Sequence, residues 1–214
     1  MIDFKGAIFD LDGTLLDSLW VWDEVDKNFL GRRGIEVPDD YMDIINPMSV
    51  MQTAEYTIKR FSLTDTPQDL IAEWNMLALK EYKTNVNMKP GAQNYLNHLK
   101  NQGAKLGIAT ASDPEIYIPA LKNLGIYDLF DAITHADEVS HGKDFPDIYL
   151  YTAEKLGVKP ENCIVFEDIF SGINSAKSAG FYTVGIFEAY SKDQDKIIKT
   201  ADMYIHSFEE IMQV

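Results

Sequence analysis

The sequence predicts an α/β protein, a three-layer sandwich in which helices cover both faces of a parallel sheet and a block of further helices is inserted. Two observations carry this prediction. Short apolar runs alternate with helical patterns along most of the 214 residues, which is typical of parallel strands joined by crossover helices. Between residues 16 and 84, in contrast, apolar residues recur at helical spacing and no strand pattern is present.

The strands and helices of the sandwich follow each other in order along the chain. The strands are expected at residues 5–9, 105–109, 132–135, 162–166, 182–187 and 203–205. The helices between them are expected at residues 91–100, 114–124, 146–156 and 171–179. Several of these helices begin at Pro or Ser, and they are followed by Gly103, Gly125, Gly157 and Gly180. Pro is favoured at the first position of a helix and Gly directly after the last, so these residues support the predicted ends.

The inserted segment has three apolar stripes at helical spacing. Their members are Trp22, Val25 and Phe29, then Met51, Ala54, Ile58 and Phe61, and then Leu70, Ile71, Trp74, Leu77 and Ala78. We expect Trp20 and Trp22 to pack in this helical core, because aromatic residues on amphipathic helices are usually buried. The segment 85–90 has the Asn, Lys and Pro content of a hinge. We therefore expect residues 16–85 to form a helical domain, and residues 1–15 with 86–214 to form the α/β core.

Composition and charge exclude several classes of protein. The chain has 19 Lys and Arg against 34 Asp and Glu, a net charge of -15, and no basic stripe, so we expect no nucleic-acid partner. The single cysteine, Cys163, cannot form an intrachain disulfide and is expected to be a buried strand residue. No segment has the ~20 consecutive apolar residues that span a bilayer, and the first residues are unlike a secretion signal. We expect a cytoplasmic protein without a membrane partner.

The candidate functional residues are those at the predicted strand ends, because open parallel sheets bind ligands beyond the carboxyl ends of their strands. These residues are Asp10 and Asp12, then Thr110, Ala111 and Ser112, then Lys143, and finally Glu167 and Asp168. Each alone is commonly a helix cap, a turn residue or a solvated charge. Together, however, four acids at adjacent strand ends repel each other strongly. A hard divalent cation with oxygen ligands relieves that repulsion.

Three motifs in this order resemble the haloacid dehalogenase superfamily, in the branch that contains phosphoglycolate phosphatase and β-phosphoglucomutase. They are residues 9–18, Phe-Asp-Leu-Asp-Gly-Thr-Leu-Leu-Asp-Ser; Gly142-Lys143 with residues 146–149, Pro-Asp-Ile-Tyr; and residues 165–168, Val-Phe-Glu-Asp, with residues 171–173, Ser-Gly-Ile. The resemblance covers nearly the whole chain. It implies a Rossmann-like parallel sheet in the core and, for residues 16–85, a small helical cap that closes over the site.

The resemblance also implies a catalytic set. Asp10 would attack phosphorus and become an aspartyl phosphate, which splits hydrolysis into two easier displacements. Asp12 would act as general acid and then as general base. Thr110 would hold the phosphoryl oxygens, and Lys143 would offset charge on the nucleophile and on the transferring group.

Binding roles follow from the same resemblance. The substrate phosphate is expected to bind at Thr110, Ala111, Ser112 and Lys143. The expected cofactor is Mg²⁺, with the ligands Asp10, Asp12 through its backbone carbonyl, Asp168 and Glu167. For Glu167 three arrangements stay open: direct binding of the metal, binding through water, or orientation of Lys143.

Two residues depart from the family pattern. Asp113 follows the phosphate-binding segment where relatives often carry a polar or basic residue, and Asp144 replaces the proline that usually follows the lysine. The arginine that binds a second phosphate in β-phosphoglucomutase-like caps has no counterpart in residues 46–50, Asn-Pro-Met-Ser-Val. The basic residues of the cap, which are expected to lie mostly on solvated faces, are Lys27, Arg32, Arg33, Lys59, Arg60, Lys80 and Lys83.

We therefore expect a monomeric, Mg²⁺-dependent phosphatase that hydrolyses a small phosphomonoester, a sugar phosphate or a similar metabolite, through an aspartyl phosphate. The alternative enzyme is a β-phosphoglucomutase-like sugar phosphomutase. A dehalogenase would not need the second acid Asp12 or the pair Glu167 and Asp168. A phosphorylated receiver domain is much shorter and has no helical insert, and an inactive binding protein would not need every catalytic residue.

Overall fold

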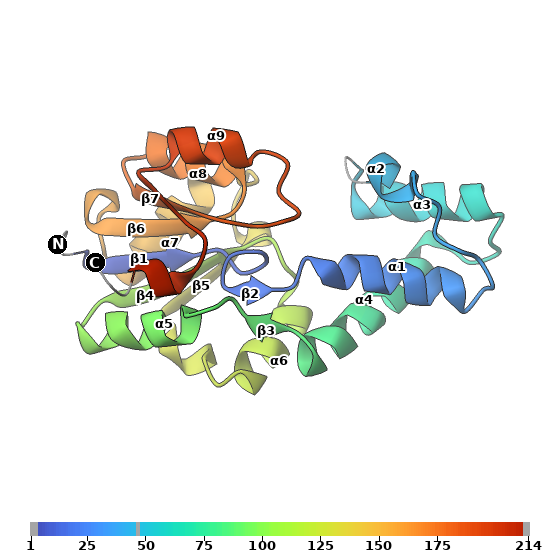
Figure 1. Ribbon diagram of the computed structural model, residues 1–214, viewed down its shortest axis with the longest axis horizontal. Helices are drawn as coiled ribbons and strands as arrows, with labels where there is room; N and C mark the ends of the chain where they lie inside the picture. Colours follow the sequence, from blue (N-terminus) through green and yellow to red (C-terminus); the bar gives the residue numbers. More distant parts are fainter. Residues whose placement is uncertain (1–3, 46–47, 212–214) are drawn as a thin grey trace. The chain divides into compact units, whose positions relative to one another are not determined.

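A computed structural model describes residues 4–45 and 48–211. The chain divides into two compact units, residues 1–19 with 86–214, and residues 20–85. The boundary inferred from the sequence lies at residue 16, whereas the structure divides the chain after Leu19. Figure 1 shows the elements of both units, coloured along the sequence.

The first unit is built on a six-stranded sheet in the order β5-β4-β1-β6-β7-β8. Its strands are β1 (Gly6–Phe9), β4 (Lys105–Thr110), β5 (Ala132–His135), β6 (Cys163–Glu167), β7 (Tyr182–Ile186) and β8 (Met203–Ile205). All neighbouring strands are parallel, and β1 lies between β4 and β6, with Gly6 opposite Lys105 and Cys163. The parallel sheet predicted from the apolar runs is confirmed.

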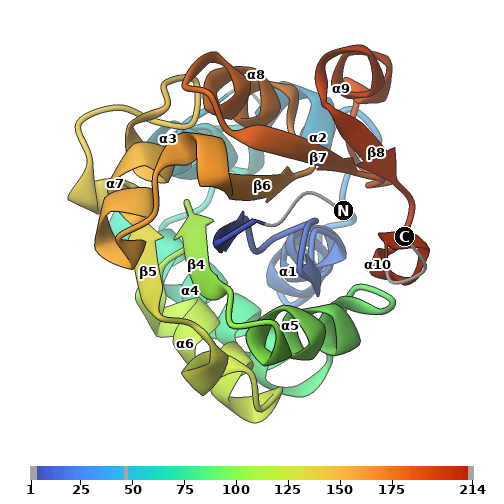
Figure 2. The same cartoon turned by 90° about the vertical axis from the view of Figure 1, so that its left-hand side faces the viewer.

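Helices cover both faces of this sheet, as Figure 2 shows. They are α5 (Ala92–Asn101), α6 (Pro114–Asn123), α7 (Asp147–Leu156), α8 (Phe170–Ser178), α9 (Gln194–Thr200) and α10 (Phe208–Ile211), with short 3₁₀ helices at Tyr127–Leu129, Ala136–Glu138 and Pro160–Asn162. Helices α5, α6 and α10 lie on one face, and α7, α8 and α9 lie on the other. The chain winds outward from β1 in both directions, and right-handed crossovers place the helices of the two halves on opposite faces.

Aromatic side chains pack between the central strands and the face that carries α5 and α10. Phe9 of β1 and Phe166 of β6 are register partners and stack with ring centroids 4.6 Å apart. Tyr95 of α5 and Phe208 of α10 each lie 5.5 Å from the Phe166 ring. Phe9 ends β1 directly before Asp10, and Phe166 directly precedes Glu167, so this packing fixes where the two acids lie.

A second, two-stranded sheet joins the chain where it leaves and re-enters the first unit. Strand β2 (Leu16–Asp17) pairs antiparallel with β3 (Asn87–Met88). The expectation of no strand after residue 16 is therefore wrong at Leu16 and Asp17, and the segment expected to be a hinge, residues 85–90, contains the strand that pairs with them. Strands of two residues show no periodicity in a sequence, which is why the pattern missed them.

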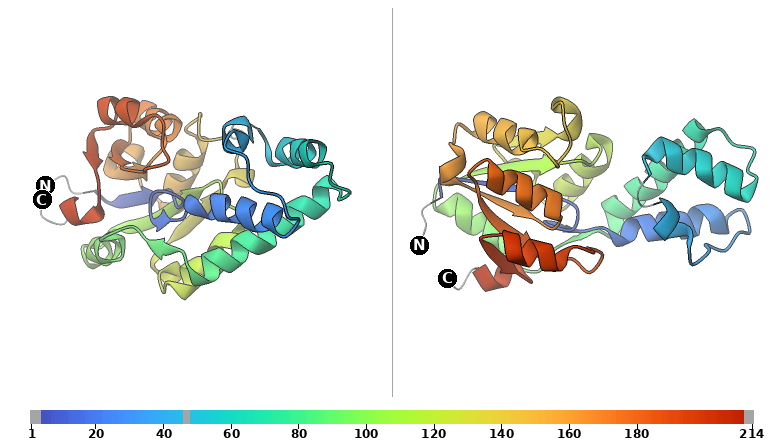
Figure 3. Two further views of the ribbon diagram at one scale, coloured as in Figure 1. Left: turned by 45° about the vertical axis from the view of Figure 1, so that its right-hand side comes forward. Right: turned by 90° about the horizontal axis from the view of Figure 1, so that it is seen from above.

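The second unit is helical, as expected. Its helices are α1 (Trp20–Gly31), α2 (Tyr41–Ile45), α3 (Val50–Phe61) and α4 (Pro67–Thr84). Helices α1 and α4 lie side by side (Figure 3), and Phe29 of α1 meets Trp74 of α4 edge to face at 5.6 Å. Capping boxes at Ser49 and Thr66 begin α3 and α4, and they satisfy backbone N–H groups at the N-terminus of each helix.

The register of the first apolar stripe differs from the expected one. The buried positions of α1 include Val21, Val25 and Phe29, while Trp22 is 40% exposed. The expectation that Trp22 packs in the helical core is therefore wrong. Val21, Val25 and Phe29 recur every four residues and form one continuous face, from which Trp22 is rotated. Met51, also expected in a stripe, is 41% exposed.

Among the described residues, no helix is both long and apolar enough to cross a membrane.

Candidate active site

Four of the expected site residues converge at the carboxyl edge of the sheet. Asp10 follows β1 directly, and Glu167 is the last residue of β6. Asp168 comes next in the chain, while Lys143 reaches the site from the loop before α7. Because β1 and β6 are neighbours in the sheet, Asp10 and Glu167 lie close together at its carboxyl edge. Lys143, 133 positions from Asp10 in the sequence, contacts both of them.

Lys143 bridges two buried carboxylates. Its Nζ donates to Asp10 Oδ1 and to Glu167 Oε1, the latter at 2.6 Å, and its side chain is only 10% exposed. Burial by itself would lower the pKa of Lys143, but the charges of Asp10 and Glu167 outweigh burial and raise that pKa. Lys143 is therefore a permanent cation beside the expected nucleophile. Its backbone is also anchored, since Ser175 Oγ donates to the Lys143 carbonyl at 2.7 Å.

Glu167 is fully buried and is surrounded by hydrogen-bond donors. Besides Lys143, the hydroxyl of Tyr149 donates to Oε1 at 2.7 Å. The backbone N–H groups of Asp168 and Ile169 donate to Oε2 at 3.2 and 3.4 Å. A carboxylate accepts about four hydrogen bonds, so these four donors occupy the carboxylate.

Asp168 is held against the turn that follows β1. Thr14 Oγ1 donates to Asp168 Oδ1 at 2.8 Å, across 154 positions of sequence. Gly13 lies beneath the same carboxylate with φ 83°, and a Cβ at Gly13 would clash with Asp168 Oδ2. Only glycine fits this position, because it adopts the left-handed conformation without strain and has no Cβ to clash with the carboxylate.

Burial and like charge make the acids of this cluster difficult to ionise. Burial, followed by the charge of Glu167, raises the pKa of Asp168 to about 7. Burial also raises the pKa of Asp10 well above its ordinary value, against the opposing effect of Lys143. One lysine therefore does not compensate the three buried carboxylates.

The donor set fits a divalent cation. Carboxylate oxygens of Asp10, Glu167 and Asp168 lie within 4.8 Å of one another, and all three residues are buried. Hard cations such as Mg²⁺ prefer oxygen ligands, and a second positive charge would compensate the remaining repulsion in this cluster. The residues present at this edge of the sheet are thus suited to hold Mg²⁺.

Asp12 lies among hydroxyl groups. Ser18 Oγ donates to Asp12 Oδ1 at 2.6 Å, and Ser112 Oγ donates to Asp12 Oδ2. The Ser112 backbone N–H donates to Thr110 Oγ1 at 3.0 Å, while Ala111 is exposed. The structure therefore joins the expected acid and base to the expected phosphate-binding segment after β4.

The two departures from the family pattern have different structural roles. Asp113 is the N-cap of α6, where its Oδ1 accepts the Glu115 backbone N–H at 2.8 Å. Asp144 is exposed, beside Lys143 in sequence. Of the cap residues 46–50, Asn46 and Pro47 lie outside the described residues.

Sequence patterns gave no role to Tyr149 or Ser18, although both belong to the quoted motifs. Tyr149 occupies the first turn of the helix after Lys143, a position that faces the sheet. This position could have indicated a role for Tyr149, because a buried tyrosine hydroxyl usually needs a hydrogen-bond partner. The partners themselves, Glu167 and Asp12, lie in distant motifs or across a turn and are fixed only by the fold.

Residues 7–186 match the family described as haloacid dehalogenase-like hydrolase. The chain therefore belongs to this family, and the resemblance drawn from its motifs is confirmed. Its similarity to proteins that are named phosphatases, over most of their length, makes it a hydrolase of phosphoric monoesters.

Two of these relatives come from Escherichia coli (strain K12). Hexitol phosphatase A is 28% identical over 209 residues, covering 97% of this chain and 93% of that protein. Fructose-1-phosphate phosphatase YqaB is 29% identical over 185 residues, covering 86% and 96%. Among solved structures, β-phosphoglucomutase from Clostridium difficile superposes with a TM-score of 0.72 at 27% identity, covering 98% of this chain and 96% of that chain.

Proposed function

We propose that this protein is a Mg²⁺-dependent phosphatase that hydrolyses a small sugar or polyol phosphate through an aspartyl phosphate on Asp10. The observation that carries the proposal is the ion pair of Asp10 with Lys143, next to a buried acidic cluster that fits a divalent cation. The relatives named for hexitol and fructose 1-phosphate support the substrate class.

In the first step, an Asp10 carboxylate oxygen attacks phosphorus and the bond from phosphorus to the ester oxygen breaks. Asp12 gives a proton to that oxygen, which leaves as an alcohol. Lys143 lies against Asp10 and offsets the negative charge that approaches it with the phosphoryl group. Thr110 and Ser112, together with nearby backbone amides, would bind the phosphoryl oxygens.

In the second step, a water molecule attacks the phosphorus of the aspartyl phosphate. Asp12, now a carboxylate, accepts the proton of this water, and Asp10 is released together with inorganic phosphate. The hydrogen bonds from Ser18 and Ser112 would hold the Asp12 carboxylate in one orientation for both proton transfers. Both steps are displacements at phosphorus, so the same groups serve both of them.

Asp10, Asp168 and the backbone carbonyl of Asp12 are the proposed ligands of Mg²⁺. When bound, the ion would stabilise charge on the phosphoryl oxygens. The carboxylate of Glu167 already accepts four hydrogen bonds. Of the three arrangements left open by the sequence, we therefore favour Glu167 as the residue that orients Lys143.

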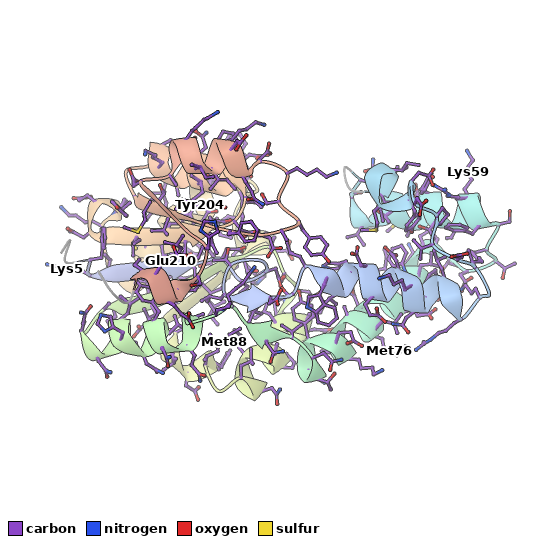
Figure 4. The ribbon with its side chains drawn as sticks, in the orientation of Figure 1. Lys5, Lys59, Met76, Met88, Tyr204 and Glu210 are labelled. Atoms are coloured by element: carbon purple, nitrogen blue, oxygen red, sulfur yellow. The ribbon has the colours of Figure 1, made fainter. Side chains whose placement is uncertain are left out.

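Residues 20–85 are the proposed cap, the part that selects the leaving group. Arginines in this unit are already engaged: Arg33 pairs with Asp65 and Glu73 at 3.0 and 2.8 Å. Arg60 pairs with Asp40 at 2.6 Å. Lys59 extends into solvent from α3 (Figure 4). These pairings favour an uncharged sugar or polyol as leaving group over one with a second phosphate.

The second candidate is a sugar phosphomutase, favoured by the similarity to β-phosphoglucomutase. A mutase must retain a bisphosphate intermediate, which requires cationic contacts for the distal phosphate. The engaged state of Arg33 and Arg60 therefore argues for the phosphatase. We also propose that the protein acts as a monomer.

The test is a comparison of phosphate release and isomerisation. The enzyme would be given fructose 1-phosphate, hexitol phosphates and, separately, β-glucose 1-phosphate with a trace of glucose 1,6-bisphosphate, each with Mg²⁺ or with excess chelator. We expect Mg²⁺-dependent phosphate release from at least one ester, its loss in Asp10→Asn and its retention in the control Asp137→Asn, which changes an exposed acid. Rapid isomerisation to glucose 6-phosphate with little free phosphate would show a mutase instead.

A further inference from the structure

Tyr149 contacts the site through its hydroxyl but has no part in the mechanism described above. The residue lies in the first turn of α7 and is fully buried. Its hydroxyl donates to Glu167 Oε1 at 2.7 Å, and its ring meets Phe181 edge to face at 6.5 Å. A phenylalanine would fill the same space, so packing alone does not account for the hydroxyl.

The oxygen that accepts this hydrogen bond is shared with Lys143. Lys143 Nζ lies 2.6 Å from the same Glu167 Oε1 and also donates to Asp10. The hydroxyl of Tyr149 is therefore two hydrogen bonds away from the ammonium group, and three away from the nucleophile. In a buried network of this kind, changing one donor alters the strength of its neighbours.

Close packing fixes this arrangement from the side of α8. A Cβ at Gly172 would lie 2.6 Å from the Tyr149 hydroxyl oxygen and 2.7 Å from Glu167 Cδ. Only a residue without a side chain leaves room for the phenol and the carboxylate to meet at this point. Gly172 of α8 therefore packs directly against the point where Tyr149 and Glu167 meet.

We propose that Tyr149 is a positioning residue: its hydroxyl shares Glu167 Oε1 with Lys143 and thereby holds the ammonium between Glu167 and Asp10. Two donors on one oxygen divide its negative charge, so Lys143 is not drawn entirely to Glu167. The ammonium then stays in contact with the nucleophile. This role in turnover rests on the proposed function, whereas the placement of Lys143 can be measured without it.

The test compares Tyr149→Phe with Tyr95→Phe. Tyr95 is also buried, but it lies on α5, on the other face of the sheet, where its ring contacts Phe166 and Phe208. Both variants lose one tyrosine hydroxyl from the core, and only Tyr149→Phe changes the surroundings of Glu167. The first readout is the ¹⁵N-lysine NMR signal of the Lys143 ammonium in metal-free protein, assigned by its loss in Lys143→Ala. The second is kcat and KM for the best phosphate ester.

We expect Tyr149→Phe to shift the Lys143 signal and to lower kcat about tenfold, in line with the loss of one hydrogen bond to a charged group. KM should change less than about twofold, because the hydroxyl does not touch the substrate. Tyr95→Phe should leave the signal, kcat and KM as they are in the wild type.

An unchanged Lys143 signal together with an unchanged kcat would overturn the proposal, whatever happens to the melting temperature. So would a change confined to KM. If the wild type hydrolyses no phosphate ester, the proposed function fails and the NMR comparison still decides the role of Tyr149. If Tyr149→Phe does not fold, 3-fluorotyrosine at position 149, with the same label at position 95 as control, alters the acidity of the hydroxyl at nearly constant shape. Lys143 must then respond to the label at 149 alone.

Discussion

Lys143, Asp10 and Glu167 are charged residues in a part of the core that excludes most water. Removing one member of such a group leaves its partner charged and uncompensated, which typically costs about 3–5 kcal/mol. Replacing a whole buried ion pair by well-packed apolar side chains of similar volume, in contrast, is often neutral or stabilising, so stability alone does not account for these three residues. The proposed phosphoryl transfer gives a reason for placing them together at this edge of the sheet.

Thr134 of β5 offers a residue-scale prediction on stability. It is fully buried, and among the described residues its Oγ1 has no hydrogen-bond partner. Thr134→Val removes this unsatisfied hydroxyl at nearly constant shape, so we expect the free energy of unfolding to rise by about 1 kcal/mol. Urea denaturation measures the change.

Thr57 of α3 is the matched control for this prediction. It is also fully buried, but its hydroxyl lies 2.7 Å from the Tyr41 hydroxyl and donates to the Thr53 carbonyl at 2.7 Å. Thr57→Val should therefore lower the free energy of unfolding by about 1 kcal/mol or more. Destabilisation by both substitutions would show that the Thr134 hydroxyl has a partner.

The chemical type of the site could be predicted from its acids taken together, whereas the hydrogen bonds within the site could not be predicted. Asp10 and Glu167 stand out because acids directly after buried apolar strands are costly without a function. The contact of Tyr149 with Glu167 joins two motifs that are 18 positions apart. Nothing local to either motif selects that partner, because the packing of α7 against the sheet determines it.

At the scale of elements, the sequence predicted the strands of the six-stranded sheet but not the two-residue strands β2 and β3. Parallel strands covered on both faces carry near-continuous apolar runs, as at residues 106–109 of β4 and 163–166 of β6. Strands β2 and β3 have two residues each and carry no such signature. Helix α1 shows a third case: Trp22 is apolar enough to suggest the stripe, yet the buried face runs through Val21.

Helix α1 also carries a buried acid, Asp26, that the catalytic site does not use. Burial, followed by the charge of Asp23, raises the pKa of Asp26 to about 7. Because the folded-state pKa lies above the unfolded value of about 4, folding favours the protonated form. The contribution to stability is fully present below about pH 4 and is lost as the pH rises to about 7.

Asp26→Asn should therefore stabilise residues 20–85 by about 2–4 kcal/mol at pH 8 and by much less at pH 4.5. Urea denaturation at both pH values measures the difference between variant and wild type. Asp39→Asn, which changes an exposed acid of the same unit, is the control and should show little difference at either pH. A stabilisation by Asp26→Asn that is equal at both pH values would contradict the titration of Asp26.

At the scale of the whole molecule, the order of the strands in the sheet brings the residues of the candidate site together. The order β4-β1-β6 places the end of β1 between the ends of two strands that lie much later in the chain. The apolar runs predicted these strands, and the rule for parallel sheets predicted which edge they share. The placement of residues 20–85 as a separate helical unit follows from their different periodicity.

The acidic cluster predicts a stabilising effect of Mg²⁺ on the whole chain. A cation that binds the folded state relieves repulsion among Asp10, Glu167 and Asp168, so saturating Mg²⁺ should raise the melting temperature by about 2–6 °C. Asp168→Asn should abolish most of this rise, while the exposed control Asp137→Asn should retain it. An equal rise in all three proteins would place the binding of Mg²⁺ elsewhere.

The proposal of an aspartyl phosphate on Asp10 is tested most directly by trapping the phosphoryl group. The enzyme would be mixed with Mg²⁺ and an activated phosphate ester, quenched in acid within milliseconds, digested and mapped by mass spectrometry, with Asp10→Asn and Asp12→Asn alongside. We predict a phosphoryl group on Asp10 in the wild type and none in Asp10→Asn. In Asp12→Asn we predict the group on Asp10 with turnover about 100- to 10,000-fold slower, because only the proton transfers are lost. A phosphoryl group on any residue other than Asp10, or its persistence in Asp10→Asn, would contradict the mechanism.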